Sequence, residues 1–208
     1  ETLRRFSSDV TWIGQIVDDD FYRAASPADN DPPRVLLAGA SQIDFKGIDI
    51  GYAAVAQARW QGASFELVRI SPWVPSQEEP LSQHVQEFHV GLSSPEMVKT
   101  MHTCDVFLGP SRRAEGFGLP AAEAMASGLP AVLTSIPSFL SFDTKHDYAL
   151  FADEEDGEGL GDRLVELLSD DDLRRQLRHR GREVVEQLRS ARFAERSEKF
   201  LLARKALL

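Results

Sequence analysis

Short apolar runs alternate with helix-length segments along most of the chain, and this alternation limits the fold more than any other feature. Where Ile48, Tyr52 and Val55 recur, the spacing is that of one helix face. Apolar strands separated by helices indicate a parallel sheet covered on both faces. The sequence therefore predicts an α/β fold with a parallel sheet of about six strands. The predicted strands are residues 34–38, 65–70, 85–90, 106–108, 131–133 and 148–151.

Length and composition exclude several classes of protein. The 208 residues are enough for one large or two small domains. With 33 acidic and 23 basic residues the net charge is −10, which argues against general nucleic-acid binding. No apolar run is long enough to span a membrane. The single cysteine, Cys104, excludes an internal disulfide framework and a multi-cysteine zinc site.

The two ends of the chain differ in character from its centre. The first residues include neither an initiator Met nor an apolar signal segment, so we expect a piece of a longer protein. Helices are expected over residues 159–168 and 171–188, with Asp170 as the N-cap of the second. The organisation we predict is a leading and linker segment over residues 1–33, a ligand-binding domain over 34–190, and a terminal helix over 191–208.

The segment 109–128 carries the strongest functional signal. It follows a predicted strand and opens a predicted helix, and ligands of open α/β sheets bind beyond the carboxyl ends of strands. Gly116 and Gly118 allow the backbone to approach a ligand closely. Pro120 suits the first helical position, where its missing N–H has no partner to lose. The amides of residues 117–119 could then receive an anion such as phosphate.

Two carboxylates, Glu115 and Glu123, flank these amides. A carboxylate only accepts hydrogen bonds, and sugar hydroxyls can donate them. An anion-binding helix end between two such acceptors suits a nucleotide sugar, with its ribose, diphosphate and hexose. The residues alone leave a simpler interpretation open, in which the glutamates lie on a solvated helix face and the glycines form an ordinary turn.

The same segment resembles the donor-binding motif of retaining glycosyltransferases of family four. Residues 115–119 and 123–130 follow the family pattern E-G-F-G-L-P and then E-A-M-A-x-G-x-P almost letter for letter. Residues 13–21 are similar to a degenerate form of the family's N-G-[VI]-D-x-x-x-F linker. The resemblance implies the C-terminal, donor-binding half of a GT-B fold, which has two Rossmann-like domains with the active site between them.

The resemblance also implies roles for individual residues. Glu115 and Lys46 become the expected catalytic residues, since one should hold the transferred sugar and the other the diphosphate. Glu123 should bind the ribose hydroxyls. The remaining donor-binding residues implied in this way are Phe117, Gly118, Leu119, Gly91, Leu92 and Gly39.

One position departs from the family pattern. The family has G-R-x-x-x-x-x-K-G after the first strand, and here Lys46 matches while Ala40 replaces the arginine. A charge-assisted bond to phosphate is worth about 1.5–3 kcal/mol. Arg112 or Arg113 could supply the second cation, although solvated surface positions are an equal alternative for both. In this family cations neutralise the diphosphate, so we expect no bound metal and no cofactor.

The function implied is retaining transfer of a sugar from a nucleotide diphosphate sugar to a hydroxyl of a glycan or glycolipid. The acceptor would bind through a missing N-terminal domain, so the fragment alone should bind donor weakly and transfer little. The alternatives are a non-catalytic nucleotide-sugar-binding subunit and a phosphorylase-like or epimerase-like enzyme. A dinucleotide-dependent oxidoreductase is disfavoured, because no G-x-G-x-x-G follows the first strand. We expect a cytoplasmic location, with membrane contact only through the missing half.

Overall fold

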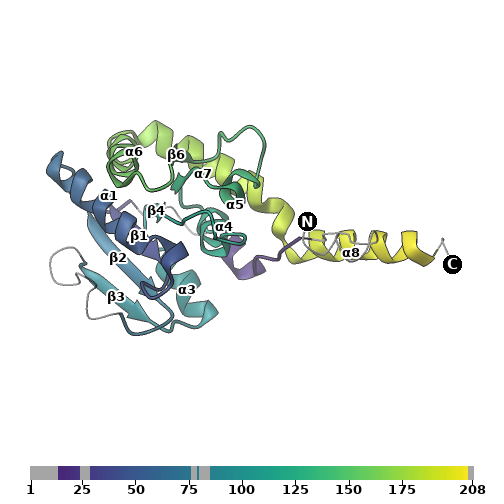
Figure 1. Cartoon of the computed structure of the whole chain (residues 1–208). Helices are drawn as coiled ribbons and strands as arrows, with labels where there is room; N and C mark the ends of the chain where they lie inside the picture. Colours follow the sequence, from purple (N-terminus) through teal and green to yellow (C-terminus); the bar gives the residue numbers. More distant parts are fainter. Residues whose placement is uncertain (1–13, 24–28, 76–78, 80–84, 206–208) are drawn as a thin grey trace.

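The computed structural model describes residues 14–23, 29–75, 79 and 85–205. Six strands form one sheet in the order β3-β2-β1-β4-β5-β6, and every neighbouring pair is parallel (Figure 1). This is the order of a Rossmann-like doubly wound sheet, so the predicted fold class is confirmed. The strands are β1 Arg34–Ala38, β2 Glu66–Ser71, β3 Glu87–Val90, β4 Val106–Gly109, β5 Ala131–Thr134 and β6 Leu150–Ala152.

Helices cover both faces of the sheet because the central strands are apolar on both sides. On one face, residues of β1 and β2 pack with α1 (Ile48–Trp60) and α6 (Gly157–Ser169) in one buried cluster. On the other face a second cluster joins the sheet to α3 (Ser94–Met101), α4 (Leu119–Ala126) and α7 (Asp171–Val185). Short elements that contribute residues to this second cluster are α5 (Pro137–Leu140), η2 (Asp19–Tyr22) and η4 (Glu186–Leu188). The remaining short helix, η3 (Asp44–Lys46), lies in the loop after β1.

Several predicted boundaries need correction. The last strand begins at Leu150 rather than at residue 148, because Leu150 is the first residue that pairs with β5. Tyr148 precedes it, buried, and its hydroxyl donates to the carbonyl of Phe139. The helix predicted over 171–188 is α7 (Asp171–Val185), which then tightens into η4. Asp170 is its N-cap as predicted, and its side chain accepts from the amide of Leu173. The helix predicted from residue 159 begins earlier, since the Asp156 side chain caps it.

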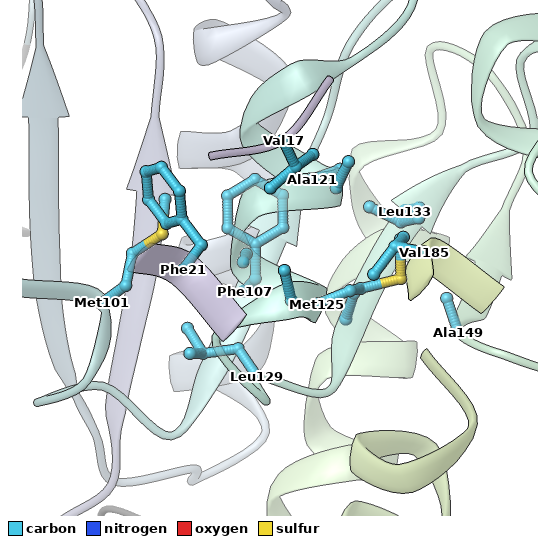
Figure 2. Close-up of a cluster of buried hydrophobic side chains, with 14 of the residues drawn as sticks. Val17, Phe21, Met101, Phe107, Ala121, Met125, Leu129, Leu133, Ala149 and Val185 are labelled. Atoms are coloured by element: carbon cyan, nitrogen blue, oxygen red, sulfur yellow. The ribbon is translucent and has the colours of Figure 1, made fainter. Parts of the chain in front are cut away.

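The leading segment is part of the core. Val17 and Phe21 are both buried, and Figure 2 shows them beside Ala121 of α4 and Phe107 of β4. Burial of side chains of this size stabilises a fold by about 1.5–3 kcal/mol each. A backbone hydrogen bond from the Val17 amide to the Leu188 carbonyl ties the segment to η4. Residues 14–23 are therefore held against α4, the helix that follows the loop of the functional segment.

The strand order places a switch point between β1 and β4. The chain runs outward from β1 through β2 to β3, then returns to β4 and runs the other way through β5 to β6. The loops that leave β1 and β4 therefore lead toward helices on opposite faces of the sheet, α1 and α4, and open α/β sheets bind ligands in the crevice this creates. The segments singled out in the sequence, residues 39–47 and 109–118, are these two loops.

The final helix, α8 (Ser190–Lys205), projects away from the sheet and its covering helices (Figure 1). Leu201 and Leu202 are exposed on it. Over the described residues, no helix combines the length and apolar character that crossing a membrane requires.

Candidate functional site

Close contact between the loops after β1 and β4 shapes the site. Gly47 has φ 58°, and a Cβ added there would lie 2.0 Å from the carbonyl oxygen of Pro110. Only glycine fits this approach without moving backbone. The amide of Arg112 also donates to the carbonyl of Phe45 at 2.8 Å. The two loops are therefore held together directly beside Lys46.

An ion pair between Lys46 and Glu115 lies in the crevice. The Nζ atom of Lys46 is 2.6 Å from Oε2 of Glu115, and their side chains are only 17% and 8% exposed. Ser111 Oγ donates to the same carboxylate oxygen at 3.3 Å. Both residues line a small pocket with the carboxyl ends of β1 and β4. The two residues that the resemblance implies as catalytic are thus brought together, although they are far apart in the sequence.

The N-terminus of α4 opens into the same pocket. Gly118 precedes the helix with φ 83°, and a Cβ there would lie 2.4 Å from the ring of Phe139. Leu119 is the first helical residue, so Pro120 stands second rather than first as predicted. The first amides of a helix have no intrahelical acceptors, and the helix dipole favours negative charge there. This helix end can therefore receive an anion beside the Lys46 ammonium.

Glu123 lies one turn into α4 and is partly buried. The pKa of its carboxyl is raised to about 7, first by burial and then by the nearby Asp18 carboxylate, while Lys46 opposes the shift. A hydrogen-bond donor that binds here, such as a sugar hydroxyl, would stabilise the ionised form of this carboxyl. Asp18 comes from the leading segment, and no pattern in the sequence placed it beside Glu123.

Arg112 is engaged in structural ion pairs. Its guanidinium binds both carboxylate oxygens of Asp49 and also reaches Glu155 and the Asp44 carbonyl. The bond to Arg112 holds the pKa of the Asp49 carboxyl below its ordinary value. These contacts tie the loop after β4 to the first turn of α1 and to the loop before α6. Binding of Arg112 to a phosphate would require these partners to be exchanged.

Arg113 differs from its neighbour in exposure. Its side chain is 74% exposed and pairs with Glu154 at 3.3 Å. This guanidinium can leave Glu154 at a small cost in free energy, because an exposed ion pair contributes about 0–1 kcal/mol. At the position of the family's arginine, Ala40 is 1% exposed and contributes only a methyl group. Of the two arginines, Arg113 is the one free to move.

The remaining predicted donor-binding residues lie at carboxyl ends of strands. Gly39 follows β1, and its amide is already bonded to the Ile70 carbonyl at 2.9 Å. Gly91 and Leu92 follow β3, and the Gly91 amide is bonded to the Ser71 carbonyl. Gly39 and Gly91 therefore shape the strand ends, and their amides are already committed to the protein.

A buried polar pair beside β2 escaped the sequence reasoning. Arg69 and Glu79 are both fully buried, with Arg69 Nε 2.8 Å from Glu79 Oε1, and the Tyr52 hydroxyl donates to the same oxygen at 2.7 Å. An arginine inside an apolar strand run was the only signal available. This cluster lies on the α1 side of the sheet, whereas α4 and Glu123 lie on the other side.

Comparison with known proteins settles the family. The model of the family described as glycosyl transferases group 1 matches residues 75–184, which is more than half of the chain. This chain belongs to the glycosyl transferases group 1 family. The resemblance noted in the motif is confirmed at this level, and family four and retention of configuration stay predictions.

Two relatives illustrate the similarity of this group 1 chain. It is 39% identical over 79 residues to D-inositol 3-phosphate glycosyltransferase of Corynebacterium urealyticum. These aligned residues cover 38% of this chain and 18% of that protein. It is 34% identical over 85 residues to N-acetyl-alpha-D-glucosaminyl L-malate synthase of Bacillus anthracis, covering 40% and 22%. The matched residues thus make up about a fifth of each relative.

Solved structures share the fold of this group 1 chain. Sucrose-phosphate synthase from Thermosynechococcus elongatus superposes with a TM-score of 0.74 at 23% identity, covering 99% of this chain and 56% of that one. HepE from Anabaena, solved in complex with UDP and glucose, superposes with a TM-score of 0.68 at 16% identity, covering 91% and 55%. The chain therefore corresponds in length to about half of each.

Proposed function

We propose that this chain is the donor-binding half of a glycosyltransferase that takes its sugar from a nucleotide diphosphate sugar. The observation that carries the proposal is the Lys46–Glu115 pair, set beside the N-terminus of α4 at the switch point of the sheet. An ammonium and a helix end suit a diphosphate, and the adjacent carboxylates suit hydroxyls. Family membership supports it, as does the HepE structure with UDP and glucose.

In this proposal Lys46 serves two partners. An ammonium has three N–H donors, so Lys46 can keep Glu115 and still donate to a phosphate oxygen. Glu115 then accepts a hydroxyl of the transferred sugar, and Glu123 accepts those of the ribose. The amides of Gly118 and Leu119 meet the diphosphate from the other side. Arg113 is the residue we assign as a second cation in place of Ala40.

The proposed reaction keeps the configuration of the sugar. The bond between C1 of the sugar and the diphosphate oxygen breaks, and its electron pair leaves with the diphosphate. The acceptor hydroxyl oxygen bonds to C1 from the same face, and its proton passes to the departing phosphate oxygen. Lys46 and the α4 amides stabilise the negative charge that grows on this leaving group, which is commonly the largest catalytic contribution. No metal or cofactor takes part in this proposal.

Calorimetric titration of the chain with UDP, GDP, ADP and TDP tests the donor site. We expect one nucleotide to bind, and Lys46→Ala to weaken it about tenfold or more, since a charge-assisted bond to phosphate is lost. Glu123→Ala should weaken the same nucleotide through its ribose. Lys145→Ala removes an exposed lysine from the loop after α5 and serves as the matched control. Unchanged binding in Lys46→Ala, or no binding by folded protein, would contradict the proposal.

The second candidate function is a non-catalytic subunit that binds nucleotide sugars. Ala40 is the observation that favours it, because a site with one fixed cation neutralises less of the diphosphate charge. Release of nucleotide from the identified donor, measured with the longer protein and a hydroxyl acceptor, separates the two. Binding without turnover selects the subunit. Turnover that falls in Arg113→Ala, with Arg175→Ala as the exposed control, selects the enzyme.

A further inference from the structure

Two buried hydroxyl groups belong to the surroundings of the Lys46–Glu115 ion pair. Ser111 lies in the loop after β4 and is 6% exposed, and Thr134 ends β5 and is 0% exposed. Because β4 and β5 are neighbours in the sheet, their carboxyl ends bring these two residues together. A hydroxyl buried to this degree costs free energy unless it is hydrogen-bonded. The acceptors of these two hydroxyls therefore show what they hold in place.

The two hydroxyls form a relay that runs from β5 to Glu115. Thr134 Oγ1 donates to the carbonyl oxygen of Ser111, and Ser111 Oγ donates to Oε2 of Glu115 at 3.3 Å. Thr134 is itself fixed, since it pairs with Ala152 of β6 and a β-branched side chain is restricted in its rotamers. The relay therefore links the orientation of the Glu115 carboxylate to a paired strand of the sheet.

Within the described part of the chain, the donors that reach the Glu115 carboxylate bind the same oxygen. Lys46 Nζ donates to Oε2 at 2.6 Å, and Ser111 Oγ donates to Oε2 as well. A carboxylate oxygen accepts about two hydrogen bonds, so Oε2 is filled and the acceptor capacity of Oε1 remains. The hollow that Lys46, Ser111 and Glu115 help to line has a volume of about 10 Å³, which is room for roughly one water-sized group. The site therefore suits a single hydroxyl at Oε1.

We propose that Ser111 and Thr134 are positioning residues, which hold Oε2 of Glu115 and so leave Oε1 for the ligand. The inference rests on the proposed function, in which Glu115 accepts a hydroxyl of the donor. Thr134 fixes the Ser111 backbone, and the Ser111 hydroxyl keeps the carboxylate from turning. The 3.3 Å bond exceeds the roughly 2.5–3.0 Å usual between oxygens, and we expect it to shorten when the donor is bound. Lys46 binds the diphosphate without the relay, so the relay affects the nucleotide sugar and not the nucleotide.

Calorimetric titration of the chain with the nucleotide identified above and with its nucleotide sugars tests the relay. The probes are UDP-glucose and UDP-N-acetylglucosamine for UDP, GDP-mannose for GDP, ADP-glucose for ADP and TDP-glucose for TDP. We expect Ser111→Ala to weaken the nucleotide sugar about threefold to tenfold, which corresponds to one hydrogen bond, and to leave the affinity for the nucleotide unchanged. Thr134→Val keeps the shape of the side chain without its hydroxyl and should cause the same selective loss. Thr134→Ser keeps the hydroxyl and should restore the affinity of the unchanged chain.

Ser138→Ala is the matched control for the loss of a buried serine hydroxyl. Ser138 is 8% exposed, and its Oγ makes no hydrogen bond within the described residues, so this variant leaves the relay intact. It should bind both ligands as the unchanged chain does. Thermal unfolding of every variant, followed by circular dichroism, measures any general loss of structure. A purely structural role for Ser111 predicts a lower midpoint and equal weakening of both ligands, whereas positioning predicts the selective loss.

Equal weakening of the nucleotide and the nucleotide sugar by Ser111→Ala would overturn the inference and assign Ser111 a structural role. Unchanged affinity for the nucleotide sugar in both Ser111→Ala and Thr134→Val would overturn it too, because Glu115 would then need no support. In either case, nucleotide binding that depends on Lys46 leaves the proposed function standing. If folded protein binds no nucleotide, the proposed function is contradicted and this inference falls with it.

Discussion

Replacing Glu123 with glutamine should stabilise the fold at alkaline pH and have little effect at acidic pH. The folded chain raises the pKa of this carboxyl from 4.5 to about 7, mainly through burial. Each pKa unit corresponds to about 1.4 kcal/mol, so ionising Glu123 costs the folded state about 3 kcal/mol. That cost is absent below pH 4.5, grows as the pH rises, and is complete above pH 7. Glutamine cannot ionise and keeps almost the same shape.

Urea unfolding followed by tryptophan fluorescence at pH 5 and at pH 8.5 measures the difference. We expect the free energy of unfolding of Glu123→Gln to exceed that of the unchanged chain by about 3 kcal/mol at pH 8.5 and by under about 1 kcal/mol at pH 5. Glu198→Gln removes the same charge from an exposed position on α8 and controls for net charge.

A second variant tests the cause of the raised pKa. Asp18→Asn removes the carboxylate that faces Glu123 and keeps a side chain able to accept from the Asp20 amide, as Asp18 does at the start of η2. At pH 8.5 this variant should show part of the increase in the free energy of unfolding that is expected for Glu123→Gln. At pH 5 its free energy of unfolding should equal that of the unchanged chain. An equal gain at both pH values, or a loss in Glu123→Gln at pH 8.5, would refute the assignment of a buried, electrostatically strained carboxylate.

Three further predictions follow from buried groups. Glu79→Ala should cost about 3–5 kcal/mol in urea unfolding, because it leaves the Arg69 charge buried and unpaired; a loss under about 1 kcal/mol would mean that water reaches Arg69. Gly47→Ala should lower the thermal midpoint and weaken nucleotide binding together, since its Cβ would meet the Pro110 carbonyl; unchanged values would mean that the two loops separate easily. Burial raises the pKa of the Cys104 thiol to about 12, so Ellman's reagent should modify it at pH 8 only on unfolding; rapid modification of folded protein would contradict this.

Much of the architecture could be predicted because it depends on local pattern. Apolar runs separated by amphipathic segments have one stable arrangement, a parallel sheet with helices on both faces, and all six predicted strands are present. The Asp170 cap was predictable because a side chain and an amide three residues away decide it. The helix α5 was missed, since four residues that include proline carry no periodic signal.

The motif alone was enough to identify residues 109–128 as the candidate functional segment. Glycines, proline and two glutamates at fixed spacing specify a strand-to-helix turn with free amides, whatever surrounds it. The spacing does not state what each side chain meets. Arg112 was one of two equal alternatives as a second cation, yet the fold commits it to Asp49 and Glu155. Acidic residues from α1 and from the loop before α6 decide this, and both are distant in the sequence.

What the sequence determined by itself is therefore the parallel sheet, the position of the turn before α4 and membership of a glycosyl transferase family. The tertiary structure decided the electrostatic state of the site. It brought Lys46 within 2.6 Å of Glu115 and placed the partly buried Glu123 near the Asp18 carboxylate. The physical reason is that backbone propensity acts over a few residues, whereas charge and desolvation depend on groups that only the folded chain places together.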